Sequence, residues 1–218
     1  MKIRIAIDLK INRVVKYFIL VDLALLAGWG LIEPIFSIFV VQKIAGATLT
    51  TVGIAAAIYW LLKSALQLPL ANFLDRRRSE KSKLYALIFG LLVLAVSAFS
   101  FSLITTITGL YVVQILHSLG FALYVASWPA LFSRHLDKDR VSYDWALDST
   151  AAGVSAGVAA FFGSIIANQF GFGAVFVLAA VFSAISAIIL FFAPDLVLPR
   201  PTTASTKFQD HTPANIGH

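Results

Sequence analysis

The sequence predicts an all-α integral membrane protein, built as a bundle of six transmembrane helices. Hydrophobic residues make up 59% of the 218 residues and charged residues 13%, whereas a typical soluble domain is about a quarter charged. Six apolar stretches are each long enough to cross a bilayer, and the basic residues gather in alternate connections between them. Lipid is therefore the expected solvent for most of this chain.

The predicted spans each contain about 20 or more mostly apolar residues, enough at ~1.5 Å per residue to cross a hydrocarbon layer of ~30 Å. Lipid offers no partners to an open strand, so each span is expected to be a helix. The spans are 17–41, 51–74, 84–104, 108–132, 146–167 and 172–193. The chain thus divides into a basic N-terminal segment (1–16), a six-helix domain (17–193) and a proline-containing tail (194–218) predicted to be disordered.

The distribution of basic residues predicts the orientation of the bundle. Fifteen of the 17 Lys and Arg residues lie in the N-terminal segment, the loops between spans 2 and 3 and between spans 4 and 5, and the tail. Lys43 lies on the opposite side, and Lys63 lies within a span. Because cytoplasmic loops carry an excess of Lys and Arg, we expect a multi-pass protein of the cytoplasmic (inner) membrane with both termini in the cytoplasm. The net charge of +6 then reflects topology and contact with membrane lipids, and no nucleic acid is expected as a partner.

Three stretches carry a family resemblance. Residues Ala71–Arg78 read Ala-Asn-Phe-Leu-Asp-Arg-Arg-Arg, Glu33–Phe36 read Glu-Pro-Ile-Phe, and Gly163–Phe172 form a passage between spans 5 and 6. Together they resemble the major facilitator superfamily, and the resemblance extends from about residue 17 to 193. Members of that family have twelve helices in two six-helix halves, related by an axis along the membrane normal. The chain is similar to a single half, made of two three-helix inverted repeats.

The resemblance implies that a second six-helix unit completes the central cavity. A homodimer with its two-fold axis along the membrane normal is the simplest arrangement, and a different half is the alternative. The family signature implies a cytoplasmic gate in which Asp75 of one half faces the start of span 5 in the other, where a helix N-terminus favours a carboxylate. Arg76 and Arg77 would then meet Asp144 or Asp148. The alternative is that the arginines only set topology and contact lipid phosphates.

Ionisable residues inside the predicted spans are candidates for solute or proton binding. Such a group costs at least about 2.5–3.5 kcal/mol at the bilayer centre, so it usually faces a bundle interior or an aqueous cavity. Asp22 and Glu33 are eleven residues apart in span 1, which places both on one helix face together with Trp29. Residues at matching depths in other spans complete the candidate set: Lys63, Gln67, Gln114 and His117.

Each of these candidates has a plainer alternative. Glu33 and Lys63 could form a static ion pair that joins spans 1 and 2. His117 could donate a hydrogen bond between helices. Asp22 could be an interfacial residue near Arg13 and Lys16.

A serine-hydrolase pattern within span 5 does not predict an enzyme. Gly153–Gly157 match the nucleophile-elbow spacing, but that motif needs a strand–turn–helix context, whereas this stretch belongs to an apolar helix. Its small residues, Ser149, Gly153 and Gly157, instead suggest close helix packing across the interface between halves. The sequence contains no cysteine and no recognisable metal, phosphate or dinucleotide motif, so we expect no catalytic residue, metal or cofactor.

These observations predict one half of a secondary transporter, which moves a small solute across the cytoplasmic membrane by alternating access as a homodimer. The alternative is a non-transporting membrane scaffold or regulatory subunit. A channel or lipid-moving protein is a third possibility.

Overall fold

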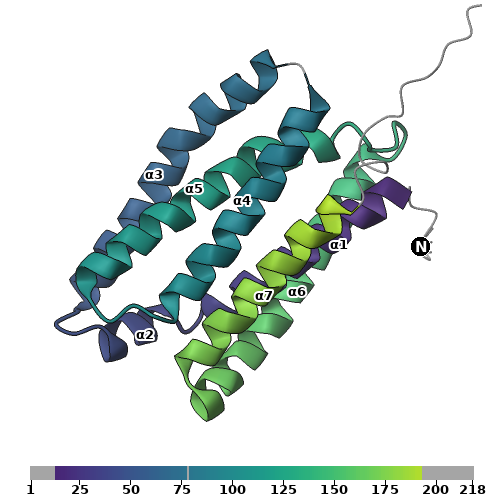
Figure 1. Cartoon of the computed structure of the whole chain (residues 1–218). Helices are drawn as coiled ribbons and strands as arrows, with labels where there is room; N and C mark the ends of the chain where they lie inside the picture. The colour runs from purple at the N-terminus through teal and green to yellow at the C-terminus, as the bar shows by residue number, and fades with distance from the viewer. Residues whose placement is uncertain (1–12, 78, 193–218) are drawn as a thin grey trace, which may run out of the picture.

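The computed structural model describes residues 13–77 and 79–192, and within these ranges every regular element is a helix. The expectations for residues 1–12, Arg78 and residues 193–218 lie outside the described residues. Figure 1 shows the helices in chain order: α1 (Arg13–Ile32), α2 (Phe36–Lys43), α3 (Leu49–Arg76), α4 (Glu80–Phe101), α5 (Ile107–Phe132), α6 (Val141–Phe170) and α7 (Phe172–Phe191). Six of them, all but the eight-residue α2, are long and apolar enough to span a membrane. The predicted all-α six-span bundle is confirmed.

The first predicted span differs from the structure because it is broken. A single helix was expected over 17–41, but α1 ends at Ile32 and α2 begins at Phe36, with a turn between them. Pro34 has no backbone N–H, so the carbonyl of Gly30 loses its helical partner. The N–H of Ile35 donates to the carbonyl of Ile32 at 3.1 Å instead of continuing the α-helical pattern. The break places Glu33 on a turn within the first span.

Polar residues fix the starts of two other helices. The hydroxyl of Thr48 accepts a hydrogen bond from the N–H of Thr51, whose hydroxyl in turn accepts from the N–H of Thr48, a capping box that starts α3. The hydroxyl of Thr106 accepts from the N–H of Gly109 at 3.1 Å and starts α5. Gly171 separates α6 from α7 with φ = 83°, a conformation that L side chains rarely adopt.

The six spanning helices form two groups of three, and each group contains helices from both halves of the sequence. Figure 1 shows α3, α4 and α5 side by side in one group and α1, α6 and α7 in the other, and α4 packs against α7 between them. Each group therefore takes its third helix from the other half of the sequence. The first three spans (α1, α3 and α4) correspond in order to the last three (α5, α6 and α7). With this correspondence, the α1–α6 and α1–α7 contacts match the α5–α3 and α5–α4 contacts. This pattern is the one expected for two three-helix repeats.

Glycines let the backbones of α1 and α6 approach closely. A Cβ atom added at Gly163 would lie 2.3 Å from the carbonyl oxygen of Leu31, and one at Gly30 would lie 2.8 Å from the Cα atom of Ala156. In contrast, a Cβ at Gly153 or Gly157 would meet nothing within 4 Å. The small residues of α6 thus serve two faces, one packed on α1 and one directed away from the bundle.

Two of the spanning helices are far less covered than the others. In the most apolar stretch of α3 and of α6, 11% of the residues are buried, against 44–56% in the other four spanning helices. The remaining spans pack around two apolar clusters, one near Phe39 and Phe176 and the other near Phe18 and Trp128. The exposed sides of α3 and α6 are therefore the least covered faces of the spanning helices in the described part of the chain.

Candidate functional site

A cavity of ≈ 390 Å³ lies where α1, α3, α5 and α6 meet the break in the first span. Its size falls within the usual range for small-molecule sites, about 300–1,000 Å³. The walls come from both of the sparsely covered helices, with Ala56 on α3 and Ala156 on α6. Its lining is mostly apolar and aromatic, with these polar or aromatic members: Trp29, Glu33, Phe36, Tyr59, Trp60, Phe101, Gln114, His117 and Phe121.

Three rings from three helices form a stack in this cavity. The imidazole of His117 on α5 lies between the rings of Trp29 on α1, with centroids 4.0 Å apart, and Tyr59 on α3, with centroids 4.4 Å apart. The planes are tilted by 9° and 13°, so the rings lie almost parallel. Such stacking holds the inner faces of α1, α3 and α5 together beside the cavity.

Hydrogen bonding of His117 is only partly satisfied. Its Nδ1 lies 3.1 Å from Oε1 of Gln114, one turn earlier on α5. Because an amide oxygen can only accept, Nδ1 is the donor in this contact. Within the described residues, Nε2 of His117 and Nε1 of Trp29 are buried without a hydrogen-bond partner.

The ion pair between Glu33 and Lys63 that the sequence allowed is not formed in this structure. Among residues 13–77 and 79–192, the ion pairs are Lys83–Asp75 and Arg134–Glu80. Glu33 lines the cavity, whereas Lys63 does not. The ammonium group of Lys63 instead lies 3.7 Å from the centre of the Trp60 ring and 5.1 Å from that of Tyr59. Lys63 therefore makes a cation–π contact beside the cavity.

Asp22 occupies a separate position, nearer the start of α1. It is 3% exposed, and one of its oxygens accepts a hydrogen bond from the hydroxyl of Tyr124 on α5. Asp148 of α6, 6% exposed, lies within electrostatic range of Asp22 and of Tyr124. Neither Asp22 nor Gln67 lines the cavity. The predicted polar face of span 1 is thus divided between two environments.

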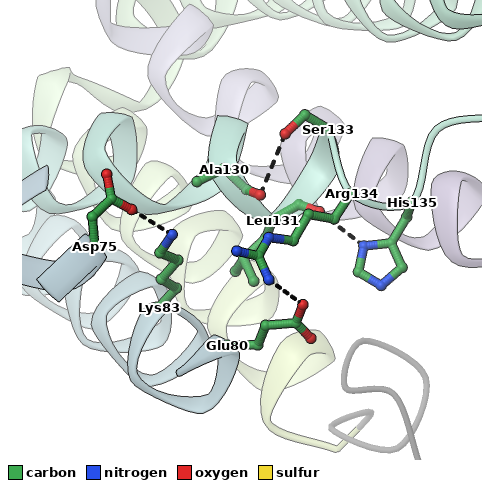
Figure 2. A network of polar contacts seen from close by, with 8 residues as sticks. All are labelled: Asp75, Glu80, Lys83, Ala130, Leu131, Ser133, Arg134 and His135. Carbon is green, nitrogen blue, oxygen red and sulfur yellow. Dashed lines mark hydrogen bonds and ion pairs between the residues drawn. The ribbon is translucent and has the colours of Figure 1, made fainter. Parts of the chain in front are cut away.

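The expected gate residues lie at the basic end of the bundle, the end that holds the α3–α4 and α5–α6 connections. Figure 2 shows Nζ of Lys83 on α4 donating to Asp75 of α3 at 2.6 Å. In the same view, Arg134, just after α5, donates to Glu80 of α4 at 2.5 Å. These two pairs join the basic ends of α3, α4 and α5 within one chain.

The other gate residues are not brought together within this chain. Arg76 and Arg77 are exposed, and the guanidinium of Arg77 lies 4.6 Å from the centre of the Phe73 ring. Asp144 is buried and accepts from the N–H of Asp137 at 3.1 Å, which fixes the connection before α6. No ion pair of the described residues joins Arg76 or Arg77 to Asp144 or Asp148. A contact between two copies remains a prediction.

Several residues of the site were not singled out by the sequence analysis. Tyr59 and Trp60 lie three or four residues before Lys63, so they neighbour it on α3. Tyr124 follows His117 by two helical turns and shares its face of α5. Lys83 and Glu80 precede the predicted third span, whereas the structure places both in the first turn of α4. The period of 3.6 residues was the available signal in each case.

Comparisons with known proteins agree with this architecture. The family model described as the Major Facilitator Superfamily matches residues 18–216. No curated protein matches the chain. A similar solved structure is the one described as the in meso crystal structure of the POT family transporter PepTSo, with a TM-score of 0.64 and 14% sequence identity.

That alignment covers 88% of this chain and 39% of the transporter chain, so this chain spans well under half the length of its structural neighbour. At that identity the likeness concerns the fold. The family match over most of the chain, together with six membrane-length helices, identifies a multi-pass membrane protein. The chain belongs to the major facilitator superfamily.

Proposed function

We propose that this chain is one half of a secondary transporter that moves a small solute by alternating access. The observation that carries the proposal is the position of the cavity. Glu33 and His117 lie on a cavity whose walls include α3 and α6, the two spanning helices with the least covered surfaces. A second six-helix unit placed over those helices would enclose the cavity and provide its opposite wall.

A second copy of the chain is the proposed partner. A two-fold axis along the membrane normal would bring α3 of one copy against α6 of the other, and the same contact would form twice. Gly53 on α3 and Gly153 and Gly157 on α6 have open space where a Cβ would lie, so they leave room for a close backbone approach. A different six-helix unit is the alternative partner.

Crosslinking between copies is the test of this pairing. Leu68 lies eight residues from the basic end of α3, and Ser149 lies eight residues from the basic end of α6. Because the chain has no native cysteine, Leu68→Cys and Ser149→Cys can be placed on separately tagged copies. We expect a disulfide-linked species carrying both tags when the two variants are co-expressed and oxidised in membranes.

The matched control uses the exposed face of α4, where Phe89 and Val96 point away from the bundle. Phe89→Cys and Val96→Cys on separate copies should not crosslink. If the Leu68→Cys and Ser149→Cys pair does not crosslink and the protein is monomeric in lipid nanodiscs, the homodimer is wrong, and the result favours the non-transporting scaffold or a different partner half.

The gate is proposed to close at the basic end of the bundle, which we assign to the cytoplasmic side of the cytoplasmic membrane. Asp75 is 69% exposed despite its bond to Lys83, and Arg76 and Arg77 are also exposed. Asp75 can therefore exchange Lys83 for the N-terminus of α6 in the other half. Asp144 and Asp148, near that N-terminus, are the acidic partners proposed for the two arginines.

Within the cavity, Glu33, His117, Gln114 and Trp29 are proposed to contact the solute directly. Lys63 beside the cavity, and Asp22 and Gln67 nearer the basic end, are proposed to act on the proton or ion balance of the transport cycle. Transport by alternating access requires the cavity to open in turn to each side of the membrane.

Accessibility of the cavity from both sides tests alternating access without knowledge of the solute. Ala56 on α3 is exposed and lines the cavity. We expect Ala56→Cys to react with a membrane-impermeant maleimide added to sealed vesicles of either orientation. A lipid-facing control, Phe89→Cys, should react slowly in both orientations. Reaction of Ala56→Cys from one side alone, in every condition, would favour the non-transporting scaffold.

A further inference from the structure

We propose that the cavity takes an organic cation, a singly charged group carried on an aromatic or bulky apolar body. This inference rests on the proposed function, because it names the class of solute that the same cavity would carry. Three features of the cavity favour this class: an unpaired carboxylate, a broken helix and walls of aromatic rings.

The charge on the cavity wall is negative. Glu33 is the one residue of the lining with a carboxylate, and none of the ion pairs in the described part of the chain involves it. The lining contains no Lys or Arg. Glu33 is exposed at the turn that follows α1, and a carboxylate without an ion-pair partner in a predicted membrane span favours a ligand that brings the opposite charge.

The broken first span adds a partial negative charge. α1 ends at Ile32, and the carbonyl of Gly30, a residue of the lining, has no helical partner because Pro34 lacks an N–H. The C-terminal end of a helix carries a partial negative charge, and transporters use such ends of broken helices to hold cations. α2 starts at Phe36 with the opposite polarity, so the full charge of Glu33 decides the sign.

The rings around the cavity suit the body of such a cation. Trp29, Tyr59, Trp60 and Phe121 line it from three helices, and the faces of these rings are electron-rich. The structure already shows one cation on this cluster, because Nζ of Lys63 lies 3.7 Å from the centre of the Trp60 ring. Lys63 approaches from outside the cavity lining, so it competes with a ligand for the same rings without filling the cavity.

A pair of ions with the same shape and opposite charge tests the proposal. Tetraphenylphosphonium and tetraphenylborate would be titrated separately by equilibrium dialysis against the full chain in zwitterionic lipid nanodiscs, with empty nanodiscs subtracted. We expect saturable binding of the phosphonium at least about tenfold tighter than that of the borate, a difference of about 1.4 kcal/mol. Equal binding, tighter borate binding or no saturable binding of either ion overturns the proposal.

Variants locate the binding to the cavity. Glu33→Gln should weaken phosphonium binding at least about tenfold, Glu33→Asp should retain part of it, and Lys63→Met should strengthen it by removing the competing ammonium. Asp139→Asn removes one negative charge from the exposed α5–α6 connection and should leave binding unchanged. Unchanged binding in Glu33→Gln, with a monodisperse protein, overturns the assignment to this cavity.

The outcomes also separate this inference from the proposed function. Phosphonium binding that depends on Glu33, together with labelling of Ala56→Cys from one side alone, would keep the cation site and remove alternating access. Labelling from both sides, with no preference for the phosphonium, would keep the transporter and remove the solute class.

Discussion

Replacing Gly163 by alanine is expected to lower the free energy of unfolding by about 3 kcal/mol, the upper end of the usual range for overpacking. The new Cβ would lie 2.3 Å from the carbonyl oxygen of Leu31 and 2.8 Å from its Cα atom. Both are backbone atoms, so no side chain can rotate away, and α1 and α6 must separate. Thermal unfolding of the purified protein in detergent, followed by loss of the monodisperse peak, measures the change.

The matched control is Gly157→Ala on the same helix. Its new Cβ would meet nothing within 4 Å, and alanine is up to about 1 kcal/mol better than glycine within a helix. We expect an unchanged or slightly higher unfolding temperature in the isolated chain. An equal loss of stability in both variants would show that Gly163 is not needed for the close approach of α1 and α6.

Removing the hydroxyl of Tyr124 is the second change with a large expected effect. Tyr124→Phe should lower the free energy of unfolding by about 1–3 kcal/mol, because buried Asp22 loses the hydroxyl that donates to it. Asp22→Asn and the double variant complete a double-mutant cycle. We expect a coupling energy of about 0.5–3 kcal/mol between the two positions, measured by thermal or denaturant unfolding.

An exposed tyrosine provides the control for this cycle. Tyr85 on α4 is 62% exposed, so Tyr85→Phe should change stability by less than about 0.5 kcal/mol. If Tyr124→Phe is as harmless as Tyr85→Phe, the contact with Asp22 does not stabilise the bundle. Asp22 would then be free to act in the transport cycle alone.

The six spans could be predicted from the sequence because lipid imposes a minimum length and a nearly continuous apolar composition. The residues at which the helices begin and end were harder to predict, since α6 begins at Val141 and not near 146. Three of the spans contain a proline, which removes a backbone hydrogen bond, so the sequence predicts an interruption in each of them. Pro69 and Pro129 lie inside continuous helices, whereas Pro34 ends one. Whether a proline breaks a helix depends on how neighbouring segments accommodate the freed backbone groups, and the sequence does not display that packing.

Counting depth along the helices was partly sufficient for the candidate site. It placed Trp29, Glu33, Gln114 and His117 at compatible levels, and the structure brings all four to one cavity. The same counting placed Lys63 near the level of His117, and placed Gln67 with Asp22 at a deeper level. None of Lys63, Gln67 and Asp22 lines that cavity. Rise per residue gives height, whereas the rotation of α3 about its own axis depends on tertiary contacts. The roles of these residues stay predictions.

The turn at Pro34 gives the first span a joint of its own. Because the Gly30 carbonyl already lacks a helical partner there, α2 can tilt relative to α1 without breaking that bond again. Phe36 of α2 lines the cavity and Phe39 packs against Phe176 of α7, while the twenty residues of α1 pack against α6 and α7. If the proposed transport function holds, we expect bending at this turn to change the cavity within a single six-helix unit, ahead of any movement of two units against each other.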